Sequence, residues 1–258
     1  MTTTPRGPAT ILGWIKPDDG MPVPAGTPDY ECFRLEPWLR ARGVTAVNVR
    51  VATSLAENGH GRDQLLKTGD VARLLEPARR LVAEGAAVLC WACTSGSFAG
   101  GLAWSRDQVR RLTAETDRPV TSASLALVAA LGALRATVVD LLSPYPEALT
   151  ATLSTFLGDC GIAVRARAAL GCPAGIDSHR LDLREATAQF TSGGGRASVP
   201  LLVPDSAVNT LDLVAGLEAR LGRPVVTANQ ATLWHALTLA GLPPAVQGAG
   251  RLLAGAGR

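Results

Sequence analysis

The sequence has few aromatic residues, few charged residues and no long apolar run. Aromatic residues make up 4% of the chain, charged residues make up 18%, and only two lysines occur, Lys16 and Lys67. The net charge of +3 is small and the arginines are scattered. We therefore expect no nucleic-acid partner, which would need a basic patch and rings for bases to stack on. No stretch of about 18 apolar residues occurs, so we expect no membrane-spanning helix and no membrane partner.

Cysteine is present, but not in a pattern that suggests a disulfide framework. The five cysteines are an odd number spread over a long chain, which is typical of reduced thiols. The first ten residues carry one arginine and no apolar stretch, so a secretory signal is not expected. We therefore predict a cytoplasmic location. The cysteines are Cys32, Cys90, Cys93, Cys160 and Cys172.

The sequence is rich in short apolar runs that alternate with segments of helical periodicity. Hydrophobic residues make up 47% of the chain. Alternation of this kind is typical of parallel sheets that helices cover on both faces. The predicted strands span residues 9–13, 45–51, 86–93, 119–122, 136–142, 162–166, 199–203 and 225–228. The predicted helices span residues 71–84, 105–116, 125–134, 146–160, 183–191, 210–221 and 230–239.

Two stretches, residues 86–131 and 197–237, share one design. Each has an apolar strand, a helix, an Arg-Pro-Val step and a second helix. Two α/β lobes can share such an arrangement by chance. If the repeat is real, Cys93 and Asp205 stand at equivalent strand ends and face one cleft, because ligands bind beyond the carboxyl ends of parallel strands. The steps are Arg118-Pro119-Val120 and Arg223-Pro224-Val225.

These patterns predict an α/β fold of two pseudo-symmetric Rossmann-like lobes. Each lobe is expected to be a parallel sheet flanked by helices, with the active site in the cleft between them. The N-terminal lobe would comprise residues 1–119 and 225–258, and the C-terminal lobe would comprise residues 120–224. A chain of 258 residues is long enough to form both cores.

Cys93 is the candidate catalytic residue because it stands where a predicted strand ends and a helix begins. Backbone N–H groups and the positive end of a helix dipole favour a thiolate at such a position. The neighbours Thr94, Ser95 and Gly96 can supply donors to an anionic oxygen. The alternative interpretation is a small buried hydrophobe, which is what most free cysteines are.

Cys90 and Cys93 form a Cys-x-x-Cys pair, which leaves a redox or zinc site open as another interpretation. However, Cys90 lies inside the predicted strand rather than after it, and no second ligand pair stands at a recognisable zinc spacing. No Gly-x-Gly-x-x-Gly or Walker-type loop follows a predicted strand. We therefore expect no metal and no organic cofactor.

Four spaced motifs run through the chain, namely Cys93-Thr94-Ser95-Gly96-Ser97-Phe98, Ser143-Pro144-Tyr145-Pro146, Leu202-Val203-Pro204-Asp205-Ser206 and Thr227-Ala228-Asn229-Gln230. Together they resemble the aspartate/glutamate racemase superfamily, and within it the branch that holds maleate cis-trans isomerases and arylmalonate decarboxylases. The resemblance extends from Ile11 to about Leu242. It implies two pseudo-symmetric lobes, a site between them and no cofactor.

The resemblance also assigns roles to residues of this chain. It implies that Cys93 is a nucleophile or base and that Thr94 and Ser95 hold a substrate carboxylate. Tyr145 corresponds to a tyrosine that hydrogen-bonds the substrate, and its alternative is an ordinary turn residue. Asn229 could contact the substrate or cap the last helix. Further substrate contacts are expected from Pro17, Asp18 and Ser206.

The chain departs from the family pattern at Asp205. Racemases and maleate isomerases of the superfamily have a second cysteine in the other lobe, whereas arylmalonate decarboxylases keep that cysteine and lack the first. This chain has the first, Cys93, and an aspartate where the second would fall. Asp205 is then either a proton donor or orienting residue, or the cap of a helix that starts near residue 208.

The resemblance and the thiol together predict a cofactor-independent isomerase of a small dicarboxylic acid such as maleate. In this reaction Cys93 would add to the double bond and so permit rotation. One alternative is an arylmalonate-type decarboxylase, or a racemase, with Cys93 as the proton donor. Another alternative is a non-catalytic protein that binds small acids. The expected partner is a small carboxylic acid in each case, and a homo-oligomer is compatible with the sequence.

Overall fold

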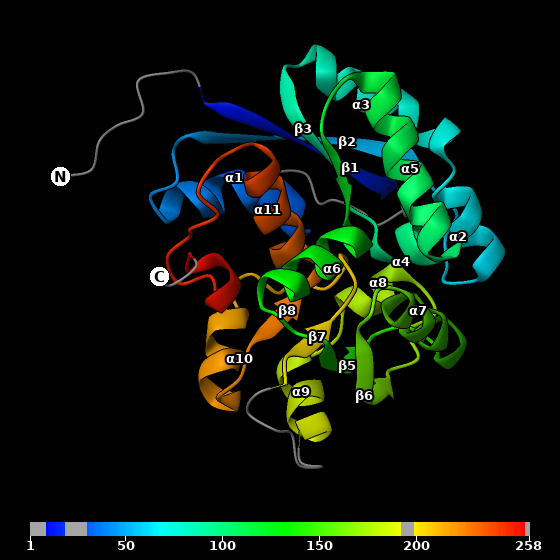
Figure 1. Cartoon of the computed structure of the whole chain (residues 1–258), viewed down its shortest axis with the longest axis vertical. Coiled ribbons are helices and arrows are strands. Elements are labelled where there is room, and N and C mark those ends of the chain that lie inside the picture. The colour runs from blue at the N-terminus through cyan, green and yellow to red at the C-terminus, as the bar shows by residue number, and fades with distance from the viewer. Residues whose placement is uncertain (1–8, 19–29, 192–198, 256–258) are drawn as a thin grey trace.

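A computed structural model describes residues 9–18, 30–191 and 199–255, which form two parallel sheets of four strands each (Figure 1). The first sheet has the order β2-β1-β3-β4 and the second has the order β6-β5-β7-β8. The predicted α/β fold of two parallel-sheet lobes is therefore confirmed. The strands are β1 (Thr10–Asp18), β2 (Val47–Leu55), β3 (Ala86–Trp91), β4 (Val120–Ser122), β5 (Val138–Ser143), β6 (Ala163–Ala169), β7 (Leu201–Val203) and β8 (Val225–Thr227).

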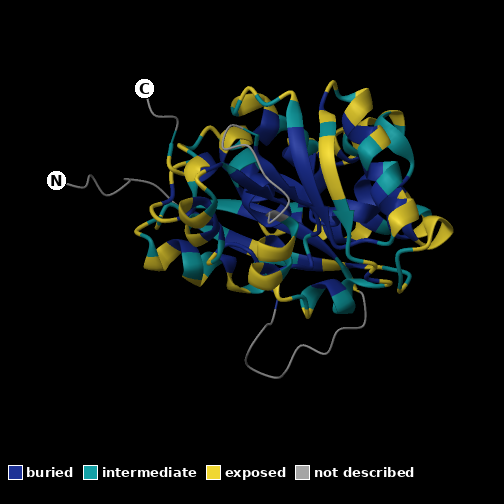
Figure 2. Cartoon of the chain, turned by 90° about the horizontal axis from the view of Figure 1, so that it is seen from below, coloured by how far each residue is buried: buried dark blue, intermediate teal, exposed yellow. Residues whose placement is uncertain are grey.

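Helices flank both sheets and turn their polar faces to solvent, whereas the central strands are buried (Figure 2). In α3, for example, Val71, Leu74 and Ala78 are buried at helical spacing, and the Asp70 carboxylate caps the helix by accepting from the Ala72 N–H at 3.0 Å. The helices are α1 (Glu31–Ala41), α2 (Arg62–Thr68), α3 (Val71–Ala83), α4 (Thr94–Phe98), α5 (Gly101–Thr116), α6 (Ala123–Ala133), α7 (Glu147–Asp159), α8 (Gly175–His179), α9 (Leu183–Thr191), α10 (Val214–Leu221) and α11 (Ala228–Leu239).

The repeat expected from the sequence is present in the topology. β3 and β7 are each the third strand of their sheets, and each is paired with the strand that carries an Arg-Pro-Val step. Cys93 follows the last residue of β3 by two positions, and Asp205 follows the last residue of β7 by two positions. The two residues therefore occupy equivalent places at the carboxyl ends of equivalent strands.

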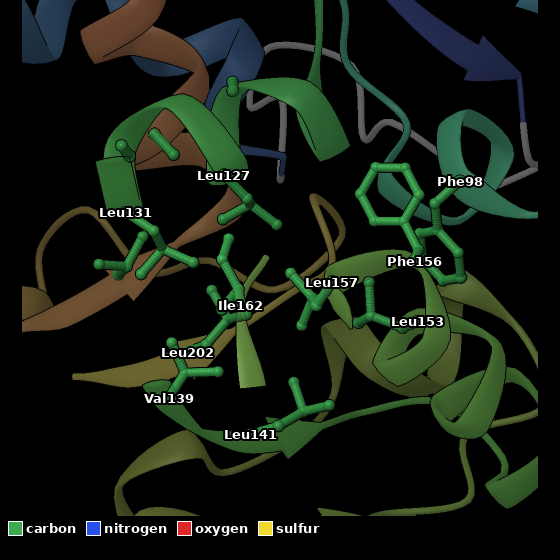
Figure 3. Packing of buried hydrophobic residues seen from close by; sticks show 14 of the residues in the cluster. Phe98, Leu127, Leu131, Val139, Leu141, Leu153, Phe156, Leu157, Ile162 and Leu202 are labelled. Carbon is green, nitrogen blue, oxygen red and sulfur yellow. The ribbon is translucent and has the colours of Figure 1, made fainter. Parts of the chain in front are cut away.

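The two lobes exchange a helix at each crossover. β4 belongs to the first sheet, but α6, which follows it directly, packs on the second sheet. There Leu127 and Leu131 join the hydrophobic cluster that contains Val139, Leu141 and Leu202 (Figure 3). The strand and the helix that follows it therefore belong to different lobes.

α11 makes the reciprocal move, because Leu233 and Leu237 belong to the cluster of the first sheet around Leu12 and Val88. The helices α6 and α11 also pack against each other, and both lie between the two sheets in Figure 1. The expected lobe boundaries at 119/120 and 224/225 need a correction here. β4 pairs with β3 and β8 pairs with β7, so the chain changes sheets at 122/123 and 227/228.

All eight predicted strands occur, whereas four helices were not predicted. α1 contains Pro37 and alternates charged with apolar residues, while α2, α4 and α8 have seven residues or fewer and so have little periodicity to detect. α10 begins at Val214 rather than at 210, and residues 211–213 before it form a turn. No helix among the described residues is long and apolar enough to cross a membrane.

A buried ion pair stabilises the second lobe. Arg223, from the second Arg-Pro-Val step, is 2% exposed and donates to the Asp140 carboxylate, which also accepts from Arg165 at 2.6 and 2.9 Å. Burial alone would raise the pKa of Asp140, but the hydrogen bonds and charges of the two arginines outweigh burial and lower the pKa. The equivalent Arg118 of the first lobe is half-buried, and within the described part of the chain it donates to the backbone carbonyls of Ala86 and Asp117.

We predict that Arg223→Met lowers the free energy of unfolding by about 3 kcal/mol, because it leaves a buried carboxylate with half of its charge pairing. Arg118→Met is the matched control at the equivalent step and should cost about 1 kcal/mol or less, the scale of one ordinary hydrogen bond. Urea unfolding measures both. Equal losses in the two variants would show that the Asp140 pair contributes nothing specific.

Candidate active site

Cys93 is held at the junction of β3 and α4. It is 6% exposed and takes the N-cap position of α4, where its Sγ atom accepts from the Gly96 N–H at 3.3 Å and lies 3.9 Å from the Ser95 hydroxyl. A Cβ atom on Gly96 would come within 2.9 Å of this sulfur. Gly96 therefore has to be glycine for the backbone donor to approach the thiol.

Asp205 occupies the equivalent place in the second lobe with an unusual backbone. Its φ is +98°, which L-residues rarely adopt, and its Oδ1 atom accepts from the Ala207 N–H at 3.0 Å. The alternative expectation that it caps a helix near residue 208 is wrong, because residues 205–208 form a turn and α10 begins at Val214. Its side chain closes that turn while bordering the same cavity as Cys93.

The cavity between the lobes has a volume of about 60 Å³. It lies at the carboxyl ends of the strands of both sheets, as expected from the sequence. Its described lining comes from β1, the start of α1, the β2–α2 segment with α2, the β3–α4 junction, the β7–α10 loop and the first residues of α8 and α11. The lining residues are Trp14, Lys16, Pro17, Tyr30, Cys32, Ala56, Glu57, Gly59, His60, Leu65, Thr68, Ala92, Cys93, Ser95, Gly175, Asp205, Ser206, Ala207 and Asn229.

Tyr145 and Thr94 lie behind the cavity wall rather than on it. Both are fully buried, and neither hydroxyl has a hydrogen-bond partner of good geometry among the described residues. Burial raises the pKa of Tyr145 well above its usual value, and the nearby Asp205 and Cys93 raise it further. Tyr145 therefore stays protonated and keeps an O–H group to donate.

Ser206 and Asn229 line the cavity, but their donors are used within the protein. The Ser206 hydroxyl donates to the Ala92 carbonyl at 2.9 Å and so ties the second lobe to the residue before Cys93. The Asn229 amide donates to Glu31 at 2.7 Å and to the carbonyls of Ser206 and Val208. These bonds favour a positioning role for both residues, and their contact with substrate stays a prediction.

Of the two substrate contacts expected after the first strand, Pro17 and Asp18, the structure places one at the cavity and the other away from it. Pro17 borders the cavity, whereas Asp18 is exposed and is not among the residues that line it. Both belong to the end of β1 rather than to a loop. The expected substrate contact of Asp18 has no support from this placement.

Glu31 was not expected from the sequence, although it organises the loop that follows Asp205. Its carboxylate accepts from the Thr210 and Leu211 N–H groups and from Asn229, so it joins α1 to the β7–α10 segment. Burial raises the pKa of Glu31 to about 7, although these donors lower it. No local pattern could have indicated it, because its partners lie some 180 residues away along the chain.

His60 and Lys16 also border the cavity and were not expected. The His60 ring donates from Nδ1–H to the Cys172 carbonyl at 2.8 Å and packs edge-on against Tyr145 with the ring centres 4.9 Å apart, which links the lobes. Lys16 could have been noticed, because a lysine interrupts the apolar run of β1. Among the described residues no cluster of three or more His, Cys, Asp or Glu side chains could hold a metal ion.

Comparison with known proteins gives a consistent result. The arylmalonate decarboxylase family model matches residues 39–253. A maleate isomerase of Pseudomonas putida KT2440 is 34% identical over 176 residues, which are 66% of this chain and 70% of that protein. An arylmalonate decarboxylase of Bordetella bronchiseptica is 31% identical over 174 residues, which are 65% and 71% of the two chains.

Solved structures share the whole fold. Nocardia farcinica maleate cis-trans isomerase, in a variant with a covalently bound succinylcysteine intermediate, aligns with a TM-score of 0.81 at 20% identity and covers 95% of this chain and 98% of that one. At this identity the alignment shows the fold alone. The resemblance inferred from the four motifs is confirmed by the sequence matches.

We predict that Gly96→Ala lowers turnover by about 10²-fold, because displacing a reacting group by about 1 Å has an effect of that size. The added Cβ would lie 2.9 Å from Cys93 Sγ and 3.2 Å from the Trp91 ring. Gly132→Ala in α6 is the control, since its Cβ would meet nothing within 4 Å. The alkylation rate of Cys93 and the steady-state rate measure the effect. Unchanged values in Gly96→Ala would mean that the thiol does not depend on this approach.

Proposed function

Because the chain belongs to the arylmalonate decarboxylase family, we propose that it is a cysteine-dependent enzyme that isomerises a small unsaturated dicarboxylic acid of the maleate type. The observation that carries this proposal is that the Cys93 sulfur borders a small cavity between the lobes and accepts a hydrogen bond from the Gly96 N–H. The 34% identical relative is a maleate isomerase, which supports the same reaction.

The chemistry needs only groups of the chain. The Cys93 thiolate forms a C–S bond to one carbon of the double bond, and the electron pair moves into the adjacent carboxylate. Rotation about the resulting single bond then becomes easy, and return of the electron pair expels the thiolate and leaves the trans acid. A related isomerase is known with a covalently bound succinylcysteine, which is the protonated form of such an adduct.

Donors near Cys93 suit the charge that develops during addition. The Gly96 N–H and the Ser95 hydroxyl lie 3.3 and 3.9 Å from the Cys93 sulfur, and Thr94 and Tyr145 lie behind the cavity wall, where Tyr145 remains a neutral donor. Donors that are already fixed when charge moves onto a carboxylate stabilise the transition state without reorganisation.

Asp205 supplies the opposite side of the cavity. A carboxyl there can give a proton to the carbon next to the adduct and take it back before elimination, which accounts for a succinyl-type intermediate. Its positive φ and its turn with Ala207 fix the side chain beside the cavity. We assign it the role of proton carrier.

The second candidate function is decarboxylation of a malonate-type acid, with Cys93 protonating the enolate. It is favoured by the family match and by the 31% identical arylmalonate decarboxylase. Loss of carbon dioxide lowers the mass of the substrate, whereas isomerisation keeps it. Incubation with maleate-type and malonate-type acids, followed by NMR and by intact-protein mass spectrometry for a Cys93 adduct, separates the two reactions. A protein without turnover on any acid would instead be a binding protein.

We predict that Cys93→Ser abolishes turnover and that Cys90→Ser retains most of it. Cys90 is fully buried inside β3, and burial alone raises the pKa of its thiol, so it stays neutral and unreactive. Circular dichroism should show that both variants are folded. An active Cys93→Ser enzyme would contradict the mechanism, and an inactive but folded Cys90→Ser enzyme would return attention to the Cys-x-x-Cys pair.

We predict that Asp205→Asn lowers turnover by about 10²-fold or more, the usual scale for an acid–base group. The amide oxygen of asparagine can still accept from the Ala207 N–H, and asparagine tolerates positive φ, so stability should barely change. Steady-state kinetics and a thermal melt measure the two quantities separately. Near-normal turnover would leave Asp205 with the turn as its only role.

A further inference from the structure

Lys16 lies next to the reacting thiol through the pairing of β1 with β3. Ile15 is paired with Trp91, and the Ala92 N–H donates to the Ile15 carbonyl at 2.9 Å. The next position of the same register sets Lys16 beside Ala92, which immediately precedes Cys93. Adjacent strands are about 4.8 Å apart, so the lysine enters the cavity one residue away from the nucleophile.

The Lys16 ammonium is buried, and the protein holds it in place. The residue is 8% exposed, its Nζ donates to the Pro17 carbonyl at 2.7 Å, and Nζ lies 4.1 Å from the centre of the Tyr30 ring. A cation removed from water is costly unless anions or dipoles compensate it. The carbonyl and the ring face supply part of that compensation and fix the direction of the side chain.

The charges around the cavity show what a dicarboxylate would meet. Among the described residues that line it, Lys16 is the only lysine or arginine, while Glu57 and Asp205 are acidic. Glu57 is paired with Arg73 at 3.0 Å, so part of its charge is compensated. An incoming dianion would otherwise face carboxylates on both sides, and Lys16 is the lining group that can offset this repulsion.

We propose that the Lys16 ammonium binds the second carboxylate of the substrate, the one that the donors around Cys93 do not hold, and so selects dicarboxylic acids over monocarboxylic acids. This inference rests on the proposed function in taking a small acid as the ligand. Lys16 therefore acts on affinity for the dianion, and the addition of the thiol to the double bond does not pass through it.

Binding of saturated acids tests the inference without turnover. Succinate and propionate are the probes, and calorimetry in a Cys93→Ser background measures their affinities. Lys16→Gln should weaken succinate binding by about 10- to 100-fold, the scale of one charged hydrogen bond, and should change propionate binding by less than about threefold. Lys16→Arg should keep most of the preference for succinate because it keeps the charge.

Lys67→Gln is the matched control, since it removes the same charge from the exposed end of α2 and should leave both affinities unchanged. Equal weakening of succinate and propionate in Lys16→Gln, or no weakening of succinate, would overturn the inference. A thermal melt shows whether Lys16→Gln is folded. If it is not, the comparison passes to Lys16→Arg and the parent, and loss of the preference for succinate over propionate in a folded Lys16→Arg variant would contradict the inference. If succinate binds selectively but no acid is turned over, the proposed function fails and the role of Lys16 stands.

Discussion

The exchange of α6 and α11 between the two sheets is the constraint on which the site depends. Each helix follows a strand of one sheet and packs on the other, so neither lobe can complete its core alone. The two helices also pack on each other. This arrangement fixes the carboxyl ends of β3 and β7 against one cavity, and that is why residues 112 positions apart, Cys93 and Asp205, border the same space.

Buried polar bonds between segments of the two halves set the finer geometry. Ser206 holds the Ala92 carbonyl, and Glu31 collects the backbone N–H groups that follow Asp205. Burial of such groups is favourable only because their partners are in place. Burial raises the pKa of Glu31 to about 7 even though these donors lower it, so burial outweighs the stabilisation that the donors give to the charged form. The loop that carries Asp205 is therefore held from two sides.

The sequence predicted the features that local patterns encode. Apolar runs located every strand, the Arg-Pro-Val steps revealed the repeat, and the strand-end position of Cys93 placed the thiol at the cavity. Glu31 and His60 were not predicted, because their hydrogen-bond partners lie more than 100 residues away along the chain. Lys16 was also not predicted, although it is visible in the sequence as a lysine within the apolar run of β1. The roles expected for Ser206 and Asn229 came from motifs, and motifs do not show that a donor is already used by a carbonyl. The predicted lobe boundaries assigned β4 and β8 to the wrong lobes, because apolar patterns do not show which sheet a strand joins.

The asymmetry between Cys93 and Asp205 limits what the site can do. The fold presents two equivalent strand ends, yet only one bears a sulfur that can add to a double bond and leave again. A thiolate is intrinsically a strong nucleophile, whereas a carboxyl group is well suited to carrying a proton. The proposed mechanism thus confines covalent chemistry to the first lobe and proton transfer to the second. A symmetric exchange of roles between two thiols, as in a two-cysteine racemase, has no counterpart here. Because the two side chains differ in chemistry, their roles cannot be exchanged. This asymmetry favours a reaction in which the substrate rotates about its own C–C bond while Cys93 stays the nucleophile and Asp205 the proton carrier.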